Sequence, residues 1–267
     1  MQRLKINSFS ILLLLSLTLG ILLAKASAVI ASESIGGTSN GCLLNAASLP
    51  LTGNAHQVMN ASRQRFYGHT QMIRLIKTAT DFIEQNKLGV MLVGDIAAKN
   101  GGPILDNHKS HQNGLDADIF LMMPDQAFVS DEDPTPEATN VIDFEKNRID
   151  RRYWSDRQFK LLKFFASDPI VDRIFVNAAI KKSLCEVNGD KKWLAKIRPW
   201  REHTEHFHVR LKCPSDSPDC VPQAAVPEKD GCDDEMLSYW LAENINPTIS
   251  EQVAEPELVK PLRCQAQ

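Results

Sequence analysis

The chain has 267 residues, of which 43% are hydrophobic, and its 30 basic and 33 acidic side chains give a net charge of −3. This length and apolar content are enough to bury one substantial core, so we expect one domain with appendages. The acidic balance argues against nucleic acid as a partner, because phosphate binding calls for a basic surface.

The N-terminal segment has the layout of a secretory signal peptide. Basic residues Arg3 and Lys5 precede an apolar run from Ile11 to Leu23, and small residues follow this run. The run is shorter than the roughly 20 residues that a membrane-spanning helix needs. We therefore expect residues 1–28 to be a signal peptide, cleaved near residue 26 or 28, and no membrane span after its removal. An uncleaved N-terminal anchor is the alternative.

Cysteine content supports an exported protein. The six cysteines are Cys42, Cys185, Cys213, Cys220, Cys232 and Cys264, and no two of them form a C-x-x-C pair. An even number without metal-site spacing favours disulfides. Six cysteines allow 15 pairings, and spacing alone favours only the short loop between Cys213 and Cys220, which flank the turn-rich "PSDSPD".

The first predicted elements are a helix and a strand. Apolar residues recur at spacings of three and four over residues 69–87, which predicts an amphipathic helix. The apolar run "LGVMLVGDIA" (88–97) predicts a buried strand. The polar, glycine-containing residues 98–110 predict a loop.

The stretch "SHQNGLDADIF" (110–120) leads from this loop into a second strand. Strand alternation over residues 115–120 puts Asp116 and Asp118 on one face and the apolar residues Leu115, Ala117 and Ile119 on the other. Gly114 allows a sharp backbone turn before the strand.

The second half of the chain also mixes helices and strands. The acidic, aperiodic residues 124–150 predict a long surface excursion beside a binding cleft. Helices are predicted over residues 156–167 and 178–185, with a strand at 171–177 between them.

"HFHVRL" (206–211) alternates strictly, with His206, His208 and Arg210 on one face of a strand. Residues 214–267 are proline-rich and contain one short predicted helix at 234–242. The resulting fold class is α+β. We expect a small antiparallel sheet that carries a zinc site, is flanked by helices and has long loops, with a disulfide-tied C-terminal tail.

Five of the seven histidines lie beside two of the predicted strands, which indicates a metal site. Zinc accepts imidazole and carboxylate ligands together, and a catalytic zinc has three protein ligands and one open position. His111, Asp118 and one histidine of the H-x-H pair would supply three ligands. Either His206 and His208 both bind, or one binds while the other accepts a proton from water. A coincidental surface pair, with Asp118 bonded to a loop amide, is the alternative without a metal.

The chain also resembles a known family on more specific motifs. These are "SHQNGLDADIF", "RPWREHTEHFHVRLKCP" (198–214), "RFYGH" (65–69), "VGD" (93–95), "RIFVN" (173–177) and all six cysteines. They are similar to the penicillin-insensitive murein endopeptidases, within the larger group of lysostaphin-like, D-alanyl-D-alanine and hedgehog-like metallopeptidases. The resemblance covers nearly all of the mature chain, so residues 29–267 are expected to form one peptidase domain, with 214–267 as its disulfide-tied extension.

This resemblance implies roles for individual residues. His111, Asp118 and His208 would bind one catalytic Zn²⁺, His206 would be the nearby catalytic histidine, and His203 would also line the site. The implied disulfides are Cys42–Cys264, Cys185–Cys232 and Cys213–Cys220.

Two positions depart from the family pattern. A second metal in the family uses the equivalent of His108 with a later aspartate and histidine, but here the later segment reads "EKNR" (145–148), so we expect a single zinc. Glu202 places a charge before His203 where the family pattern leads us to expect none.

The implied activity is periplasmic hydrolysis of the cross-link between D-alanine and meso-diaminopimelate in peptidoglycan, by metal-activated water. No G-x-S-x-G or H-E-x-x-H motif supports a serine hydrolase or a thermolysin-like protease. The alternatives are a D,D-carboxypeptidase or amidase on the same scaffold, or a non-catalytic wall-binding protein. The sequence does not decide between a monomer and a homodimer.

Overall fold

The computed structural model describes residues 31–104, 109–128, 139–247 and 259–265. The predicted signal peptide, both of its cleavage positions and His108 lie outside these residues. Within this part of the chain, no helix combines the length and the apolar character needed to cross a membrane.

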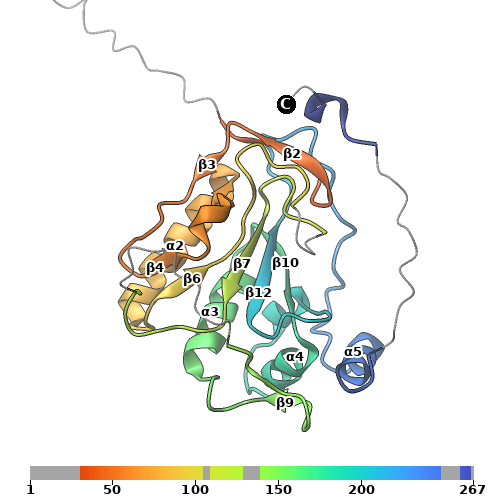
Figure 1. Ribbon diagram of the computed structural model, residues 1–267. Helices are drawn as coiled ribbons and strands as arrows, with labels where there is room; N and C mark the ends of the chain where they lie inside the picture. Colours follow the sequence, from red (N-terminus) through yellow and green to blue (C-terminus); the bar gives the residue numbers. More distant parts are fainter. Residues whose placement is uncertain (1–30, 105–108, 129–138, 248–258, 266–267) are drawn as a thin grey trace, which may run out of the picture. The chain divides into compact units, whose positions relative to one another are not determined.

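A mixed six-stranded sheet is the centre of the described part (Figure 1). Its strands lie in the order β11 (Ile197–Pro199), β10 (Val171–Val176), β12 (His206–Leu211), β7 (Asp116–Phe120), β6 (Met91–Val93) and β4 (His56–Val58). The four central strands pair antiparallel, whereas β11 and β4 join the two edges in parallel. The prediction of an antiparallel sheet is therefore wrong at its edges. Parallel neighbours need a crossover, and here a helix lies between the strands of each parallel pair.

Four α-helices complete the main elements in the described residues. They are α2 (Thr70–Asn86), α3 (Asp156–Ser167), α4 (Ala178–Cys185) and α5 (Glu235–Ile245). Local capping explains where they begin: Ser155 and Gln158 form a capping box for α3, and the Asn177 side chain accepts a hydrogen bond from the backbone of Ala179 to cap α4. All four helices lie close to the predicted ranges.

Short strands and turns make up the remaining elements, and the sequence pattern did not predict them. Strands β1 (Glu33–Gly37) and β2 (Asn40–Leu44), β3 (Ala47–Ser48) and β5 (Tyr67–Gly68), and β8 (Ile142–Asp143) and β9 (Arg148–Ile149) form three antiparallel pairs. The 3₁₀ turns are η1 (Ala61–Arg63), η2 (Lys192–Lys196) and η3 (Leu262–Cys264).

The two faces of the sheet differ in polarity, as the alternation predicts. Strand β12 directs Phe207 and Val209 into a buried core shared with helices α2, α3 and α4. Strand β7 adds Ala117 and Ile119 to the same core. The alternate residues of both strands, which include two histidines and two aspartates, therefore lie on the opposite face.

The acidic segment 124–150 is not wholly a surface excursion. Val141, Ile142 and Ile149 are buried in the main core, and the hairpin β8–β9 contacts α4 through β9. The prediction failed there because three apolar residues in a charged hairpin give no clear period. Residues 129–138 of this segment lie outside the described part.

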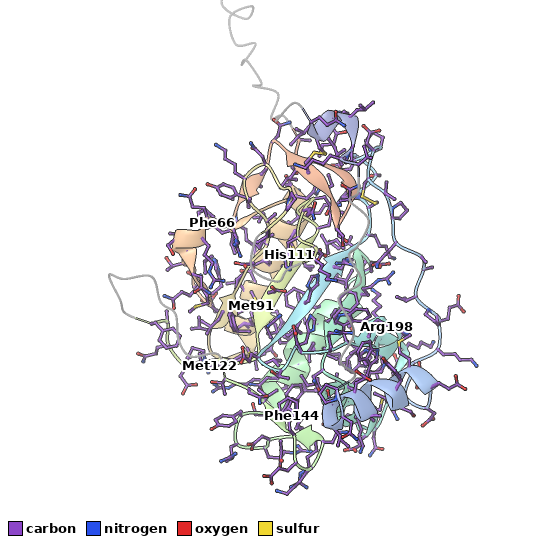
Figure 2. The ribbon with its side chains drawn as sticks, turned by 45° about the vertical axis from the view of Figure 1, so that its right-hand side comes forward. Phe66, Met91, His111, Met122, Phe144 and Arg198 are labelled. Carbon is purple, nitrogen blue, oxygen red and sulfur yellow. A yellow bond between two sulfur atoms is a disulfide. The ribbon has the colours of Figure 1, made fainter. Side chains whose placement is uncertain are left out.

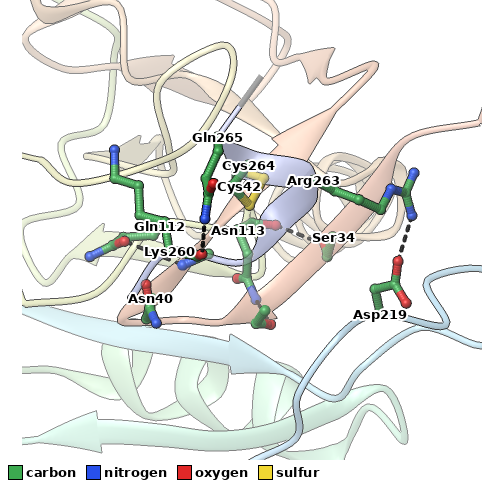
Figure 3. Close-up of a disulfide and its surroundings, with 12 residues drawn as sticks. Ser34, Asn40, Cys42, Gln112, Asn113, Asp219, Lys260, Arg263, Cys264 and Gln265 are labelled. Carbon is green, nitrogen blue, oxygen red and sulfur yellow. Dashed lines mark hydrogen bonds and ion pairs between the residues drawn. A yellow bond between two sulfur atoms is a disulfide. The ribbon is translucent and has the colours of Figure 1, made fainter. Parts of the chain in front are cut away.

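Three disulfides tie distant parts of the chain together. The pairs are Cys42–Cys264, Cys185–Cys232 and Cys213–Cys220, which are the pairs that the family resemblance implies. Cys42–Cys264 attaches the C-terminal turn η3 to the β1–β2 hairpin, and beside it Arg263 forms an ion pair with Asp219 (Figure 3). Arg263 also forms an ion pair with Glu33. The extension is thus held at its end as well as near its start.

Removing the Cys42–Cys264 bridge should destabilise the protein more than removing Cys213–Cys220. In the chain-entropy model a bridge between residues 222 positions apart contributes about 5 kcal/mol, against about 2 kcal/mol for 7 positions. Urea unfolding of the two double Cys→Ser variants measures the difference. Equal losses would contradict this assignment of the long bridge's role.

Candidate metal centre

The pairing of β7 with β12 brings the predicted site residues together. His208 lies opposite Asp118 in the ladder, and Arg210 lies opposite Asp116. All four side chains are at least nine-tenths buried, on the face of the sheet away from the main core. His111 approaches this face from the loop that precedes β7 (Figure 2).

Three buried side chains form a candidate metal-binding group. His111 Nε2 lies 3.4 Å from Asp118 Oδ2, and His208 Nδ1 lies 3.3 Å from Asp118 Oδ1. One ligand atom from each residue lies within 4.8 Å of the other two, and no second such His/Cys/Asp/Glu group occurs in the described residues. Two imidazole nitrogens and one carboxylate oxygen match the donor set of a catalytic zinc.

The second nitrogen of each imidazole supports this fit. His111 Nδ1 lies 2.9 Å from the carbonyl oxygen of Ile96, and His208 Nε2 lies 3.1 Å from Asp116 Oδ1. Ligand histidines commonly donate their other N–H to a carbonyl or a carboxylate, which fixes the ring and its tautomer. His111 Nε2 and His208 Nδ1 are therefore the nitrogens that face Asp118.

Asp116 contacts two of the candidate ligands, although the sequence pattern did not single it out. Its carboxylate accepts two hydrogen bonds from Arg210, at 2.7 and 3.0 Å, and one from the backbone N–H of His111 at 3.0 Å. It also faces His208, so it contacts two of the three candidate ligands. The D-A-D spacing was the available signal, because residues i and i+2 of a strand share a face.

His111 needs this support because its backbone is strained. Its φ is 67°, in the left-handed region that residues other than glycine rarely adopt. Gly114, with φ 74°, makes the predicted sharp turn, and a Cβ there would lie 2.6 Å from the Leu43 side chain and 2.9 Å from the backbone nitrogen of His69. The loop can therefore reach β7 only with glycine at position 114.

The charges of the group favour a cation. Burial by itself would raise the pKa of both carboxyls, but Arg210 with His208 holds the pKa of Asp116 well below its usual range, and His111 with His206 does the same for Asp118. Burial opposes the charged form of His111, yet Asp118 and Asp116 raise its pKa to about 9. Arg210 pairs with Asp116 through two hydrogen bonds, and Asp118 lies beside the imidazoles of His111, His206 and His208.

The other two predicted histidines lie beside the group. His206 is partly exposed, and its Nε2 is 3.8 Å from Asp118 Oδ1. His203 has its ring centroid 5.1 Å from that of His206 and 6.1 Å from that of His208. Of the two alternatives for the H-x-H pair, this geometry favours His208 as the ligand with His206 next to it.

His203 is held as a neutral imidazole. Burial, and then the neighbouring His206 and His208, lower its pKa to about 3. Its Nδ1 lies 2.7 Å from the carbonyl oxygen of Arg201, so Nδ1 donates and Nε2 is an acceptor. Glu202 is exposed, and only its carbonyl oxygen has a described contact, a hydrogen bond from Asn177.

The segment "EKNR" (145–148), on which the expectation of a single zinc rests, begins between β8 and β9. Lys146 forms an ion pair with Asp143 at 3.1 Å, and Asn147 donates a hydrogen bond to the carbonyl oxygen of Leu241.

Comparisons with known proteins identify close relatives. The family model described as penicillin-insensitive murein endopeptidase matches residues 34–267. Proteins of that name from Haemophilus influenzae, Klebsiella pneumoniae strain 342 and Escherichia coli are 43%, 37% and 38% identical over 236 residues. These alignments cover 88% of this chain and 82%, 85% and 85% of the relatives.

Asp118→Ala should abolish tight zinc binding, and Asp116→Asn should weaken it roughly 10- to 100-fold, the usual effect of losing a partner of a ligand histidine. Competition with a chromophoric chelator measures the affinity. Asp172→Asn is the matched control, because it also removes the charge of an arginine-paired aspartate, 2.6 Å from Arg173, outside the ligand set. Asp116→Asn binding zinc as tightly as the control would contradict this role of Asp116.

Proposed function

Because the chain belongs to the penicillin-insensitive murein endopeptidases, we propose that it is a zinc endopeptidase that hydrolyses the D-alanyl-meso-diaminopimelyl cross-links of peptidoglycan. Membership of the family makes it a peptide-bond hydrolase. The observation that carries the proposal of a metal mechanism is the convergence of His111, Asp118 and His208 beside two further histidines.

The zinc ion would be held by His111 Nε2, Asp118 and His208 Nδ1. Zinc in such a site polarises a scissile carbonyl and lowers the pKa of bound water to about 7. Asp116 Oδ1, 3.1 Å from His208 Nε2, would orient the His208 ring, and the carbonyl oxygen of Ile96, 2.9 Å from His111 Nδ1, would do the same for His111.

His206 and His203 would handle protons in this site. His206, beside Asp118 and partly open to solvent, is placed to take a proton from the attacking water or to stabilise the developing oxyanion. His203 offers a neutral acceptor nitrogen close to it, and one of these imidazoles can then protonate the leaving amine. All the groups assigned to chemistry among the described residues are imidazoles and carboxylates, so a β-lactam would find no serine to acylate there.

Export and compartment follow from the same proposal. Residues 1–28 would be removed as a signal peptide, and residues 29–267 would work in the periplasm as one peptidase domain with 214–267 as its extension. Three disulfides in the described structure suit an oxidising compartment.

Digestion of cross-linked muropeptide dimers tests the reaction type. The purified mature protein should convert dimers to monomers, and a chelator should stop the conversion until zinc is restored. Mass spectrometry of the products gives the readout. Loss of a terminal D-alanine from intact dimers would instead identify a carboxypeptidase, cleavage of the stem peptide from the glycan an amidase, and unchanged dimers despite bound zinc a wall-binding protein.

His206→Ala should keep zinc and lose most turnover, because His206 lies outside the candidate ligand group. A fall of roughly 10²- to 10⁴-fold is expected for the loss of a general acid or base. Zinc content by elemental analysis, measured beside the rate, separates the two roles. A zinc-free His206→Ala protein would show that both strand histidines are ligands.

A further inference from the structure

The turn that carries His203 has a strained backbone conformation, which needs contacts from other parts of the chain to stabilise it. Glu202 has φ 59° and His203 has φ 48°, so two successive residues, neither of them glycine, adopt the left-handed conformation. Such residues persist only where surrounding contacts fix them. The turn lies between β11 and β12, and its conformation sets where the His203 ring points.

Asn177 is the first of these contacts. It is fully buried at the start of α4, its backbone N–H donates to the carbonyl oxygen of His203 at 3.2 Å, and its Nδ2 donates to that of Glu202 at 3.0 Å. Its Oδ1 accepts from the backbone N–H of Ala179 at 3.0 Å. Asn177 thus caps α4 and holds both strained residues, Glu202 through its side chain and His203 through its backbone.

The C-terminal helix α5 holds Asn177 in turn. Asn244 of α5 and Asn177 exchange hydrogen bonds through their side-chain amides, at 2.8 and 3.0 Å. Asn244 also donates to Asn147 Oδ1 at 3.0 Å. Three amides from the β8–β9 turn, α4 and α5 therefore form one network under the His203 turn.

Helix α5 also contacts the first half of the same turn, at Trp200 and Arg201. Trp240, one helical turn before Asn244, lies with its ring centroid 5.0 Å from that of Trp200 and 5.9 Å from the Arg201 guanidinium carbon. Residues four apart share a helix face, so both contacts come from one side of α5. Residues 200–203 are then contacted along their whole length by α5 or by the asparagine it holds.

We infer that α5 is a positioning element of the active site, which fixes the His203 imidazole through Asn244 and Trp240. The inference rests on the proposed function, in which His203 acts beside the metal. It gives the extension 214–267 a part in the reaction: Cys185–Cys232 anchors the chain just before α5 to the end of α4. The candidate metal ligands lie on β7, on β12 and in the loop before β7, so loss of the α5 contacts should leave them in place.

Asn244→Ala tests the inference, with Asn246→Ala as the matched control, because Asn246 is exposed just past the end of α5. Asn244→Ala should lower kcat on muropeptide dimers roughly 10- to 100-fold, as expected for a misplaced catalytic group, with KM and zinc affinity unchanged. Asn177→Ser should act in the same direction, because serine still caps a helix but lacks the amide donor. Asn246→Ala should match the wild type.

A double-mutant cycle identifies the residue through which Asn244 acts. Once His203→Ala has removed the imidazole, adding Asn244→Ala should cost no further rate. An equal fold-loss in both backgrounds, a wild-type kcat for Asn244→Ala or a parallel loss of zinc affinity would each overturn the inference. A fully active His203→Ala protein would instead refute the role of His203 in the proposed function.

Hydrogen exchange gives a readout that does not depend on activity. The amides of Asn177 and Trp200 are bonded to the carbonyl oxygens of His203 and Val176. Both should exchange faster in Asn244→Ala while the amides of β7 and β12 stay protected. Unchanged exchange at Asn177 and Trp200 would show that α5 does not hold the turn.

Discussion

Strands β7 and β12 pair so that His208 faces Asp118 and Arg210 faces Asp116 across one antiparallel ladder, and the rest of the site depends on this register. A slip of one residue would move every side chain of a strand to the other face of the sheet. The buried core on that other face, with Phe207 and Val209 of β12, makes such a slip costly. The hydrophobic core thus fixes the positions of the polar residues opposite it.

Burial on the polar face imposes a second constraint, because a buried ionised group is stable only with partners. Arg210 balances Asp116 through two hydrogen bonds, and Asp116 then supports His111 and His208. The Asp118 carboxylate lies within 4 Å of the imidazoles of His111, His206 and His208, in a group that could hold a metal ion. The Asp116 carboxylate therefore both neutralises the buried Arg210 and contacts two of the candidate ligands, His111 and His208.

Much of this arrangement could be predicted from the chain. The period of residues 69–87, the alternation of "HFHVRL" and the sharp turn at Gly114 are local properties, and the structure confirms them. The parallel edge strands could not be read from strand patterns, because a strand of three residues carries almost no periodic signal. The sequence showed Asp116 only as a strand residue, because its pairing with Arg210, 94 positions later, depends on the folded structure.

The support of the His203 turn was hidden for a related reason. Glu202 and His203 in "REHTEH" adopt the left-handed conformation without any glycine that would predict it from the sequence. The asparagines that stabilise this turn come from three distant segments. Family resemblance supplied the ligand set and the cysteine pairs, whereas contacts between remote segments needed the folded structure.

Anomalous diffraction at the zinc edge, from crystals of the zinc-loaded mature protein, tests the central claim most directly. The account predicts one strong peak bound by His111 Nε2, Asp118 and His208 Nδ1, at roughly 2.0–2.2 Å from each ligand atom, with Asp116 beyond bonding distance of the metal. A peak elsewhere, or one bound through His206 in place of one of these residues, would contradict it.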